Sequence, residues 1–243
     1  MSSPIDLLSD SSKFGAKTNS RAFSLLPKHA CKDAATRACA GVCYVFKMLA
    51  DRADAYLFVE KNFALTKRAD FVTRMIYYIQ RANVPDFRIH SGGDFYDDKK
   101  YLPDWIEIIK ACPDVKFTLY TRRWRIQSSI PGLTKLASLP NVNLWLSEDV
   151  DTGRSPAIRN TRVAWLACND GQLPPDHANL AFRATAERLT TIYYDDKGKP
   201  KGRRRFTPLK TMGNNVTVCP HENGLPNMPK TCVECRICMW RTG

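Results

Sequence analysis

The C-terminal end of the chain carries four cysteines whose spacing is typical of iron–sulfur proteins. Cys219 is followed at a distance by three closely spaced cysteines, Cys232, Cys235 and Cys238, in a C-x12-C-x2-C-x2-C pattern. Three thiolates at successive x2 spacings can each bind a different iron of one cubane, while a fourth thiolate arrives from elsewhere in the chain. A [4Fe–4S] cluster on these four residues is therefore the expected cofactor.

Zinc is the alternative metal for this tail. A tetrahedral zinc site usually takes two separated pairs of ligands, and the residue nearest to Cys219 that could complete a pair is His221. With either metal, the segment is rich in proline and glycine and has almost no periodicity, so we expect it to fold only with its metal bound.

Three further cysteines, Cys31, Cys39 and Cys43, lie in the segment CKDAATRACAGVCY near the N-terminus. Their x7 and x3 spacing leaves three interpretations open: a second cluster with an open site, an extra ligand for the first cluster, or thiols that lie close together without a metal. The remaining two, Cys112 and Cys168, stand in apolar surroundings and are expected to be small buried hydrophobes. Replacing either should leave the metal content unchanged.

The charge of the chain favours a polyanionic partner. The formal net charge is +13, from 37 Lys and Arg against 24 Asp and Glu, and the isoelectric point is near 9.4. Such an excess of positive charge in a chain of this size predicts binding to nucleic acid, either DNA or RNA. A generally basic, solvated surface is the alternative. The sequence does not give the oligomeric state.

Two basic segments are the expected contacts with nucleic acid. The first, TRRWR at 121–125, follows a predicted strand and offers guanidinium groups for phosphates and an indole for stacking on a base, although it could also be a solvated helix start. The second, KGKPKGRRRF at 197–206, lies in a predicted hairpin and holds cations with no acid. The expected contacts are Arg122, Arg123, Trp124, Arg125, Lys199, Lys201, Arg203, Arg204 and Arg205.

Two acidic residues after predicted strands are the candidates for catalysis. Asp94 lies in the loop HSGGDF, whose glycines allow a close approach of the backbone to an anion or a cluster, and Glu148 begins the loop EDVD. A tight turn capped by Asp94 and salt bridges to neighbouring arginines explain the two residues equally well. Whether the protein is an enzyme therefore stays open.

The elements that must position these residues alternate between strands and helices. Strands are predicted at 21–27, 86–90, 115–121, 142–148, 163–168 and 179–185, and helices at 44–67, 70–82, 101–112 and 133–139. This alternation predicts an α/β fold with a parallel sheet that forms a full or partial (β/α) barrel at 21–190. Residues 1–20 are predicted to be a mobile N-terminal arm, and residues 191–243 a basic hairpin and an iron–sulfur tail that pack on the barrel.

No apolar run is long enough to span a membrane, and the N-terminus lacks the basic start and apolar stretch of a secretory signal. We therefore expect a cytoplasmic protein with no membrane partner. In that compartment, cysteines are more often used for metal binding or catalysis than for disulfides.

Several motifs together resemble the gene product 88 proteins of phages and plasmids. The resemblance covers most of the chain and rests on CYVF after the first cysteine group, on FRIHSGGDFYD, on FTLYTRR and on CRICMW near the C-terminus. The family's motifs match Cys31, Cys39, Cys43, Gly93, Asp94, Phe95, Tyr120, Thr121, Cys219, Cys232, Cys235 and Cys238. The resemblance implies an origin in a mobile element and a barrel-like fold related to radical-SAM proteins.

The start of the radical-SAM cysteine loop is similar to Cys39-x3-Cys43-Tyr44, but Phe46 stands where that loop has its third cysteine. The first functional hypothesis is therefore an iron–sulfur protein of a mobile element that binds nucleic acid for regulation, replication or defence. The alternative is a radical-SAM-like or nucleic-acid-modifying enzyme. A third hypothesis is an interaction protein whose tail is held by zinc.

Overall fold

A computed structural model describes most of the chain between residues 20 and 183 and short stretches beyond it. The described residues are 9–10, 20–50, 52–168, 172–183, 192–194, 200–203, 216–219, 235 and 237–238. Cys232, Lys199, Arg204 and Arg205 lie outside these residues, so the predictions that concern them are not addressed by the structure.

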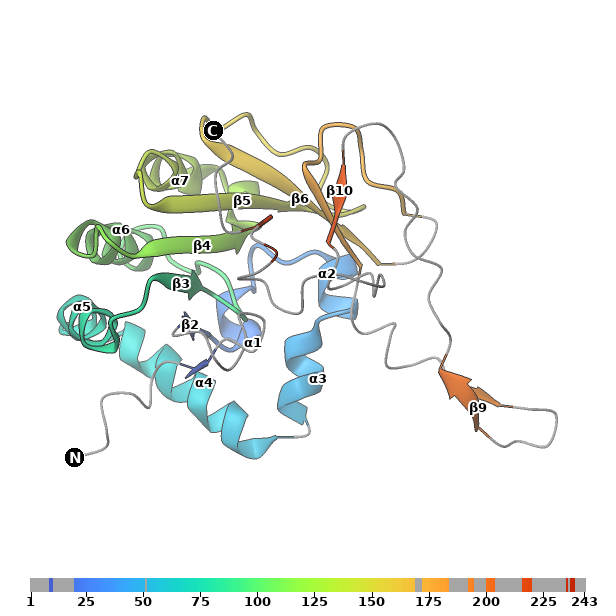
Figure 1. The fold of residues 1–243 in the computed structure, drawn as a ribbon, viewed down its shortest axis with the longest axis horizontal. Helices are drawn as coiled ribbons and strands as arrows, with labels where there is room; N and C mark the ends of the chain where they lie inside the picture. Colours follow the sequence, from blue (N-terminus) through green and yellow to red (C-terminus); the bar gives the residue numbers. More distant parts are fainter. Residues whose placement is uncertain are drawn as a thin grey trace.

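A single large sheet forms the centre of the molecule (Figure 1). Its order is β1-β2-β3-β4-β5-β6-β7-β10, and every neighbouring pair is parallel except β1 with β2. The strands are β1 (Ser9–Asp10), β2 (Arg21–Phe23), β3 (Asp86–Ile89), β4 (Lys116–Thr121), β5 (Val142–Glu148), β6 (Thr161–Ala167), β7 (Leu180–Arg183) and β10 (Thr217–Val218). The predicted α/β fold with a parallel sheet is confirmed.

Three helices pack against one face of this sheet: α5 (Phe71–Ala82), α6 (Tyr101–Ala111) and α7 (Ile130–Ala137). Alternate strand residues such as Phe87 and Phe117 meet apolar helix residues such as Trp105 in one continuous core. The alternation follows from the two-residue period of a strand, which sends every second side chain to the same face. This core fixes the position at which each of β3, β4 and β5 ends.

Four helices lie between β2 and α5: α1 (Pro27–Ala30), α2 (Arg37–Gly41), α3 (Tyr44–Ala50) and α4 (Ala53–Thr66). The single helix predicted at 44–67 is therefore two helices, because Arg52 has extended backbone angles at the start of α4. Leu26, Val45, Leu49 and Val59 form a small separate core that joins α1, α3 and α4.

Other boundaries also differ from the prediction. The strand predicted at 21–27 ends at Phe23, since Pro27 begins α1. Two residues of the predicted mobile arm form β1, in which Asp10 pairs with Arg21. The described residues between β5 and β6 contain turns and no helix, so the alternation of strands and helices stops after β5.

The predicted basic hairpin is present as two antiparallel strands, β8 (Ile192–Tyr194) and β9 (Pro200–Arg203), with an irregular register at Tyr193 and Tyr194. Its turn lies outside the described residues. Within the described part of the chain, no helix combines the length and the apolar character that a membrane span requires.

Candidate metal centre

The N-terminal cysteine segment, residues 31–43, lies beside the carboxyl ends of β4 and β5. Cys31 is the C-cap of α1, Cys39 lies in α2, and Cys43 directly precedes α3. Residues at and just after the carboxyl ends of β4 and β5 contact this segment, as the bonds below show. We call this side of the sheet the carboxyl edge, which is where ligands bind in open parallel α/β sheets.

The three thiols of this segment lie within range of one another's charge. Burial is the main cause that raises the pKa of Cys31, and Asp94, Cys39 and Cys43 raise it further. Burial likewise raises the pKa of Cys39, with Arg122 opposing and Cys43 adding to the shift. Both cysteines are therefore shifted toward the neutral thiol, chiefly by burial.

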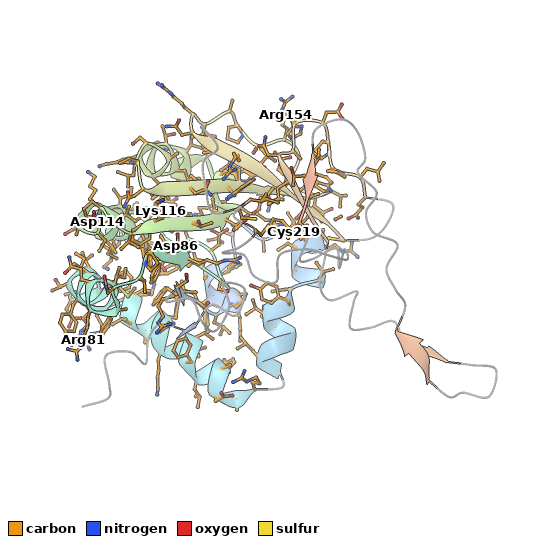
Figure 2. The ribbon with its side chains drawn as sticks, viewed as in Figure 1. Arg81, Asp86, Asp114, Lys116, Arg154 and Cys219 are labelled. Carbon is orange, nitrogen blue, oxygen red and sulfur yellow. The ribbon has the colours of Figure 1, made fainter. Side chains whose placement is uncertain are left out.

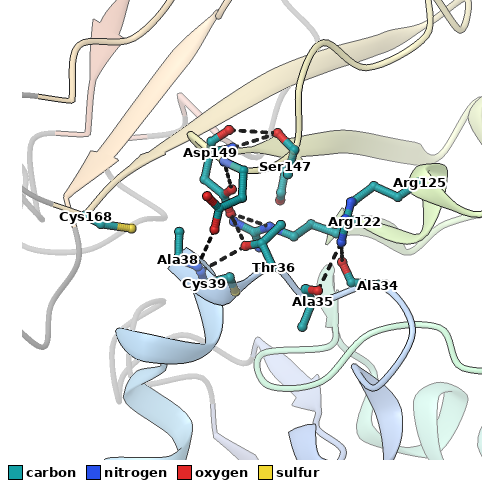
Figure 3. A network of polar contacts seen from close by, with 12 residues as sticks. Ala34, Ala35, Thr36, Ala38, Cys39, Arg122, Arg125, Ser147, Asp149 and Cys168 are labelled. Atoms are coloured by element: carbon teal, nitrogen blue, oxygen red, sulfur yellow. Dashed lines mark hydrogen bonds and ion pairs between the residues drawn. The ribbon is translucent and has the colours of Figure 1, made fainter.

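A buried ion pair holds the segment to the carboxyl edge (Figure 3). The guanidinium of Arg122 lies 3.1 Å from a carboxylate oxygen of Asp149, whose side chain is fully buried. The same oxygen accepts a 2.6 Å hydrogen bond from Thr36 Oγ1, which in turn accepts one from the backbone N–H of Cys39. The position of Cys39 is therefore fixed through Thr36 by the end of β5.

Two further contacts secure the same segment. The backbone N–H of Ala38 donates to Asp151 at 2.7 Å. Arg125 donates to the carbonyl oxygens of Ala34 and Ala35 at 2.9 and 3.0 Å (Figure 3). Side chains that follow two different strands thus satisfy backbone groups of the cysteine segment.

The two glycines of the HSGGDF loop allow its backbone to come close to the residues on either side of the cysteine segment. Gly93 has a φ of 92°, and a Cβ there would lie 2.8 Å from Cβ of Leu25. A Cβ on Gly92 would lie 2.9 Å from a methyl carbon of Val45, in α3. The hydroxyl of Tyr44 donates to the carbonyl of Ser91. The loop therefore packs tightly on the residues that flank the cysteine segment.

Asp94, a predicted catalytic candidate, is buried and saturated with hydrogen bonds. Its carboxylate accepts from Thr121 Oγ1 at 2.6 Å and from the backbone N–H groups of Arg122 and Phe95 at 2.8 and 2.7 Å. Burial raises the pKa of Asp94, and these bonds lower it in part. Asp94 therefore ties the loop after β3 to the end of β4.

Glu148, the other candidate, is buried at the end of β5 and contacts a histidine. Its carboxylate lies 2.7 Å from His177 Nε2 and accepts a hydrogen bond from the backbone N–H of Ser155. The arginine pair that was expected for this acidic loop is formed by the next residue, Asp149, with Arg122. The pair of Glu148 and His177 lies at the carboxyl edge but has no described contact with the cysteine segment.

In the predicted nucleic-acid loop at 121–125, Arg123 and Trp124 are buried, Arg122 is partly buried and Arg125 is exposed. Arg123 is buried and contacts Asp98 and Ser129, and Trp124, only 7% exposed, donates its indole N–H to the carbonyl of Ser147. In this conformation the indole offers no exposed face to a base. The sequence did not predict these internal contacts, because Asp98 and Asp149 are distant in the chain and no local pattern pairs them with the arginines.

The C-terminal cysteine tail meets the opposite face of the sheet, by which we mean the face that α5, α6 and α7 do not cover. Cys219 follows β10, and both Cys219 and Cys238 pack in a cluster with Trp145 and Tyr120. Burial raises the pKa of Tyr120, and Cys238 and Cys219 contribute to the shift. Two cysteines from the two ends of the predicted motif therefore meet at one tyrosine.

Backbone carbonyls of the tail are held by side chains of this opposite face. The amide of Asn143 and the indole N–H of Trp145, the latter at 3.0 Å, donate to the carbonyl of Cys238. Arg162 donates to the carbonyl of Ile237 at 3.4 Å. Figure 2 shows Cys219 away from Asp86 and Lys116, which begin β3 and β4, toward the other end of the strands. Of the tail, the described residues Ile237 and Cys238 lie beside the first half of β5 and the start of β6.

No three His, Cys, Asp or Glu side chains converge closely enough to hold one metal ion within the part of the chain that the structure describes. The two cysteines that are predicted to lack a metal, Cys112 and Cys168, differ in how deeply they are buried. Cys112 is buried in the main core as expected, whereas Cys168, which follows β6, is only partly buried.

Comparisons with known proteins agree with the motif resemblance. The Gene product 88 family matches residues 6–240. A Gene 88 protein of Mycobacterium phage L5 is 26% identical over 221 residues, which is 86% of this chain and 77% of that protein. A Gene 88 protein of Mycobacterium phage D29 is 30% identical over 150 residues, 56% of this chain and 60% of that protein. No solved structure matches. The chain belongs to the Gene product 88 family.

Proposed function

We propose that the protein is an iron–sulfur protein of a mobile element that binds nucleic acid, with a [4Fe–4S] cluster on Cys219, Cys232, Cys235 and Cys238. One observation carries the proposal: Cys219 and Cys238, at the two ends of the motif, both pack against Tyr120. All four thiolates of a cubane converge on one cluster, so such a cluster requires the first and last cysteines of the motif to lie near each other.

The surroundings of these cysteines suit a cluster with four thiolates, which carries net negative charge. Two arginines of the opposite face lie nearby, Arg88 over the ring of Tyr120 at 5.3 Å and Arg162 over the ring of Trp145 at 4.0 Å. Cations and hydrogen-bond donors around a cluster stabilise its charge and tune its potential. A sheet that curls into a partial barrel around the tail would complete this environment.

The contacts with nucleic acid are assigned to the basic hairpin. Lys201 and Arg203 lie in β9, next to a run of arginines in the sequence, and the chain as a whole carries a net charge of +13. Lysine and arginine in a hairpin can follow a phosphate backbone without reading the bases. Arg122, Arg123 and Trp124 are not part of this proposal, because their described contacts are internal.

The test of the cluster is the anaerobic purification of the protein and of its Cys235→Ser variant. The wild-type protein should be brown, and the variant should lose the iron of the tail, since the metal that the tail binds also stabilises its fold. Cys112→Ala is the matched control, because that thiol is buried in the main core. A colourless wild-type protein that contains zinc would overturn the proposal.

An enzyme is the second candidate function, and a separate observation favours it. The N-terminal cysteine segment lies at the carboxyl edge of a parallel sheet, where α/β enzymes bind their substrates, and not with the tail on the opposite face. A structural cluster in the tail does not account for these three thiols.

A further inference from the structure

A buried carboxylate orients one histidine at the carboxyl edge. The side chain of Glu148, at the end of β5, is 1% exposed, and its two carboxylate oxygens have different partners. Oε1 accepts a 2.7 Å hydrogen bond from the backbone N–H of Ser155, and Oε2 lies 2.7 Å from Nε2 of His177. The loop after β5 therefore fixes the carboxylate, and the carboxylate in turn fixes the imidazole ring.

This contact determines which ring nitrogen of His177 carries the proton. A carboxylate only accepts hydrogen bonds, so Nε2 of the neutral ring donates and Nδ1 keeps its lone pair. The side chain of His177 is 26% exposed, so a substrate can reach the ring from solvent. A histidine that a buried carboxylate orients in this way is suited to accept a proton from a substrate.

The two loops that carry this pair also present groups that suit a nucleic acid. Arg154, which Figure 2 labels, and Arg159 are exposed in the loop after β5. Val150, in the same loop, is 47% exposed, and Leu173, in the loop before β7, is 49% exposed. Guanidinium groups bind phosphates, and apolar side chains beside a few polar groups are typical of binding sites.

We infer that His177 is the general base of a ribonuclease site and that Glu148 is its positioning residue. This inference rests on the nucleic-acid binding proposed above and narrows the substrate to RNA, whose 2′-hydroxyl can serve as the nucleophile.

The reaction needs no co-reactant other than water. Nδ1 of His177 takes the proton of a ribose 2′-hydroxyl, and the 2′ oxygen forms a bond to the adjacent phosphorus. The bond from phosphorus to the 5′ oxygen breaks, and that oxygen takes a proton from water. The products are a 2′,3′-cyclic phosphate and a 5′-hydroxyl, and the imidazolium returns its proton to the solvent.

Cleavage of an RNA oligonucleotide by the full-length protein tests the base. The wild-type protein should produce a 2′,3′-cyclic phosphate end, and His177→Gln should cleave about 100- to 10,000-fold more slowly. His29→Gln is the matched control and should cleave at the wild-type rate. His29 also faces a glutamate, Glu60, at 3.4 Å, but this pair joins α1 to α4.

The 2′-O-methyl RNA of the same sequence separates this inference from the proposed function, because its nucleophile is blocked. Wild-type protein and His177→Gln should bind it equally, which also shows that the variant is folded. A protein that binds it but leaves ordinary RNA intact overturns the ribonuclease site and leaves the proposed function standing. Cleavage that His177→Gln retains at the wild-type rate also overturns the inference. A protein that binds neither RNA nor DNA overturns both proposals.

The role of Glu148 is measured on the ring of His177 itself. Proton–nitrogen NMR of the wild-type protein should show the neutral ring with its proton on Nε2, and the signal is assigned by its absence in His177→Gln. In Glu148→Gln the amide can turn either its oxygen or its nitrogen to the ring, so the two tautomers should mix. Cleavage at saturating RNA should slow in this variant while the affinity for 2′-O-methyl RNA stays unchanged. A proton on Nδ1 in the wild-type protein overturns the assignment.

Discussion

At the scale of single residues, the cysteine segment depends on polar side chains that sequence patterns did not identify. Asp149 accepts from Thr36 and from Arg122, and it is fully buried. The sequence does place Asp149 in an acidic loop and Arg122 in a basic one, but each pattern is typical of solvated surface. Their pairing arises only when β4 and β5 lie side by side.

Replacing Arg122 by alanine should destabilise the protein by about 3–5 kcal/mol, because it leaves a buried carboxylate without its cation. Urea unfolding at neutral pH measures the change. Arg68→Ala is the matched control, since Arg68 forms an exposed ion pair with Asp70 and should matter little. Equal losses in the two variants would show that the Arg122 pair does not hold the segment.

The Gly93→Ala substitution should cost roughly 1–3 kcal/mol in backbone strain alone, and more from the clash with Leu25. Gly153 is the control, because its φ is also positive, at 69°, while nothing lies within 4 Å of a Cβ there. Unfolding free energies should therefore fall further for Gly93→Ala than for Gly153→Ala. The same cost at both positions would argue against the tight packing of the HSGGDF loop.

His90 should make the fold sensitive to mild acid. Burial lowers its pKa from 6.5 to about 3, so below pH 6.5 the unfolded chain takes up a proton that the folded protein does not. The free energy of unfolding is unaffected by His90 titration above pH 6.5. Below pH 6.5 it falls by about 1.4 kcal/mol per pH unit, until the pH reaches the pKa of His90 in the folded protein. Unfolding free energies at pH 7.5, 6 and 5 measure this slope.

The control for this slope is His90→Asn, because asparagine tolerates the positive φ of 59° at this position. Its unfolding free energy should depend less on pH between 5 and 6.5 than that of the wild-type protein. An identical slope in both proteins would assign the acid sensitivity to other groups.

At the scale of elements, the pattern of apolar residues predicted the helices and strands in which that pattern is clear. The helix α6 and the strands β4 and β5 lie close to their predicted bounds, since a strong apolar stripe or a short apolar run decides them. The break between α3 and α4 and the edge strand β1 were missed, because backbone angles at one residue and pairing with a distant strand decide them.

The two cysteine groups also differ in how much the sequence alone predicts about them. Spacing alone predicted that the tail forms one metal site, and this stays a prediction, since Cys232 lies outside the described residues. Spacing left the N-terminal group undecided, because its geometry depends on contacts from Arg125 and Asp149. Likewise, the composition of the 121–125 loop predicted contacts with nucleic acid, whereas Arg122, Arg123 and Trp124 have partners within the protein.

The basic hairpin should supply the salt-dependent part of nucleic-acid binding. Changing Arg203, Arg204 and Arg205 to alanine should weaken binding to every sequence alike and flatten the salt dependence by roughly one log–log unit per lost contact. Fluorescence anisotropy with short DNA and RNA probes at several salt concentrations measures both effects.

The matched control removes the same charge from exposed lysines of three helices, through Lys61→Ala, Lys110→Ala and Lys135→Ala. These changes should leave the salt slope nearly unaltered. If the intact protein binds neither DNA nor RNA at low salt, where electrostatic binding is strongest, the nucleic-acid part of the proposal fails.

At the scale of the whole molecule, one parallel sheet carries both groups of cysteines. Bonds from Arg125 and Asp149, which follow β4 and β5, hold the N-terminal segment, whereas Cys219 and Cys238 pack beside Trp145 on the face that α5, α6 and α7 leave uncovered. The chain belongs to the Gene product 88 family, and the relatives that it matches are proteins of Mycobacterium phages.

The mass of the intact, anaerobically prepared protein under native conditions tests the central claim most directly, because it counts metal and sulfide together on each chain. The account predicts an increment equal to four irons and four sulfides, and the loss of this increment in Cys235→Ser. A chain that carries zinc, or no metal after reconstitution with iron and sulfide, would contradict it.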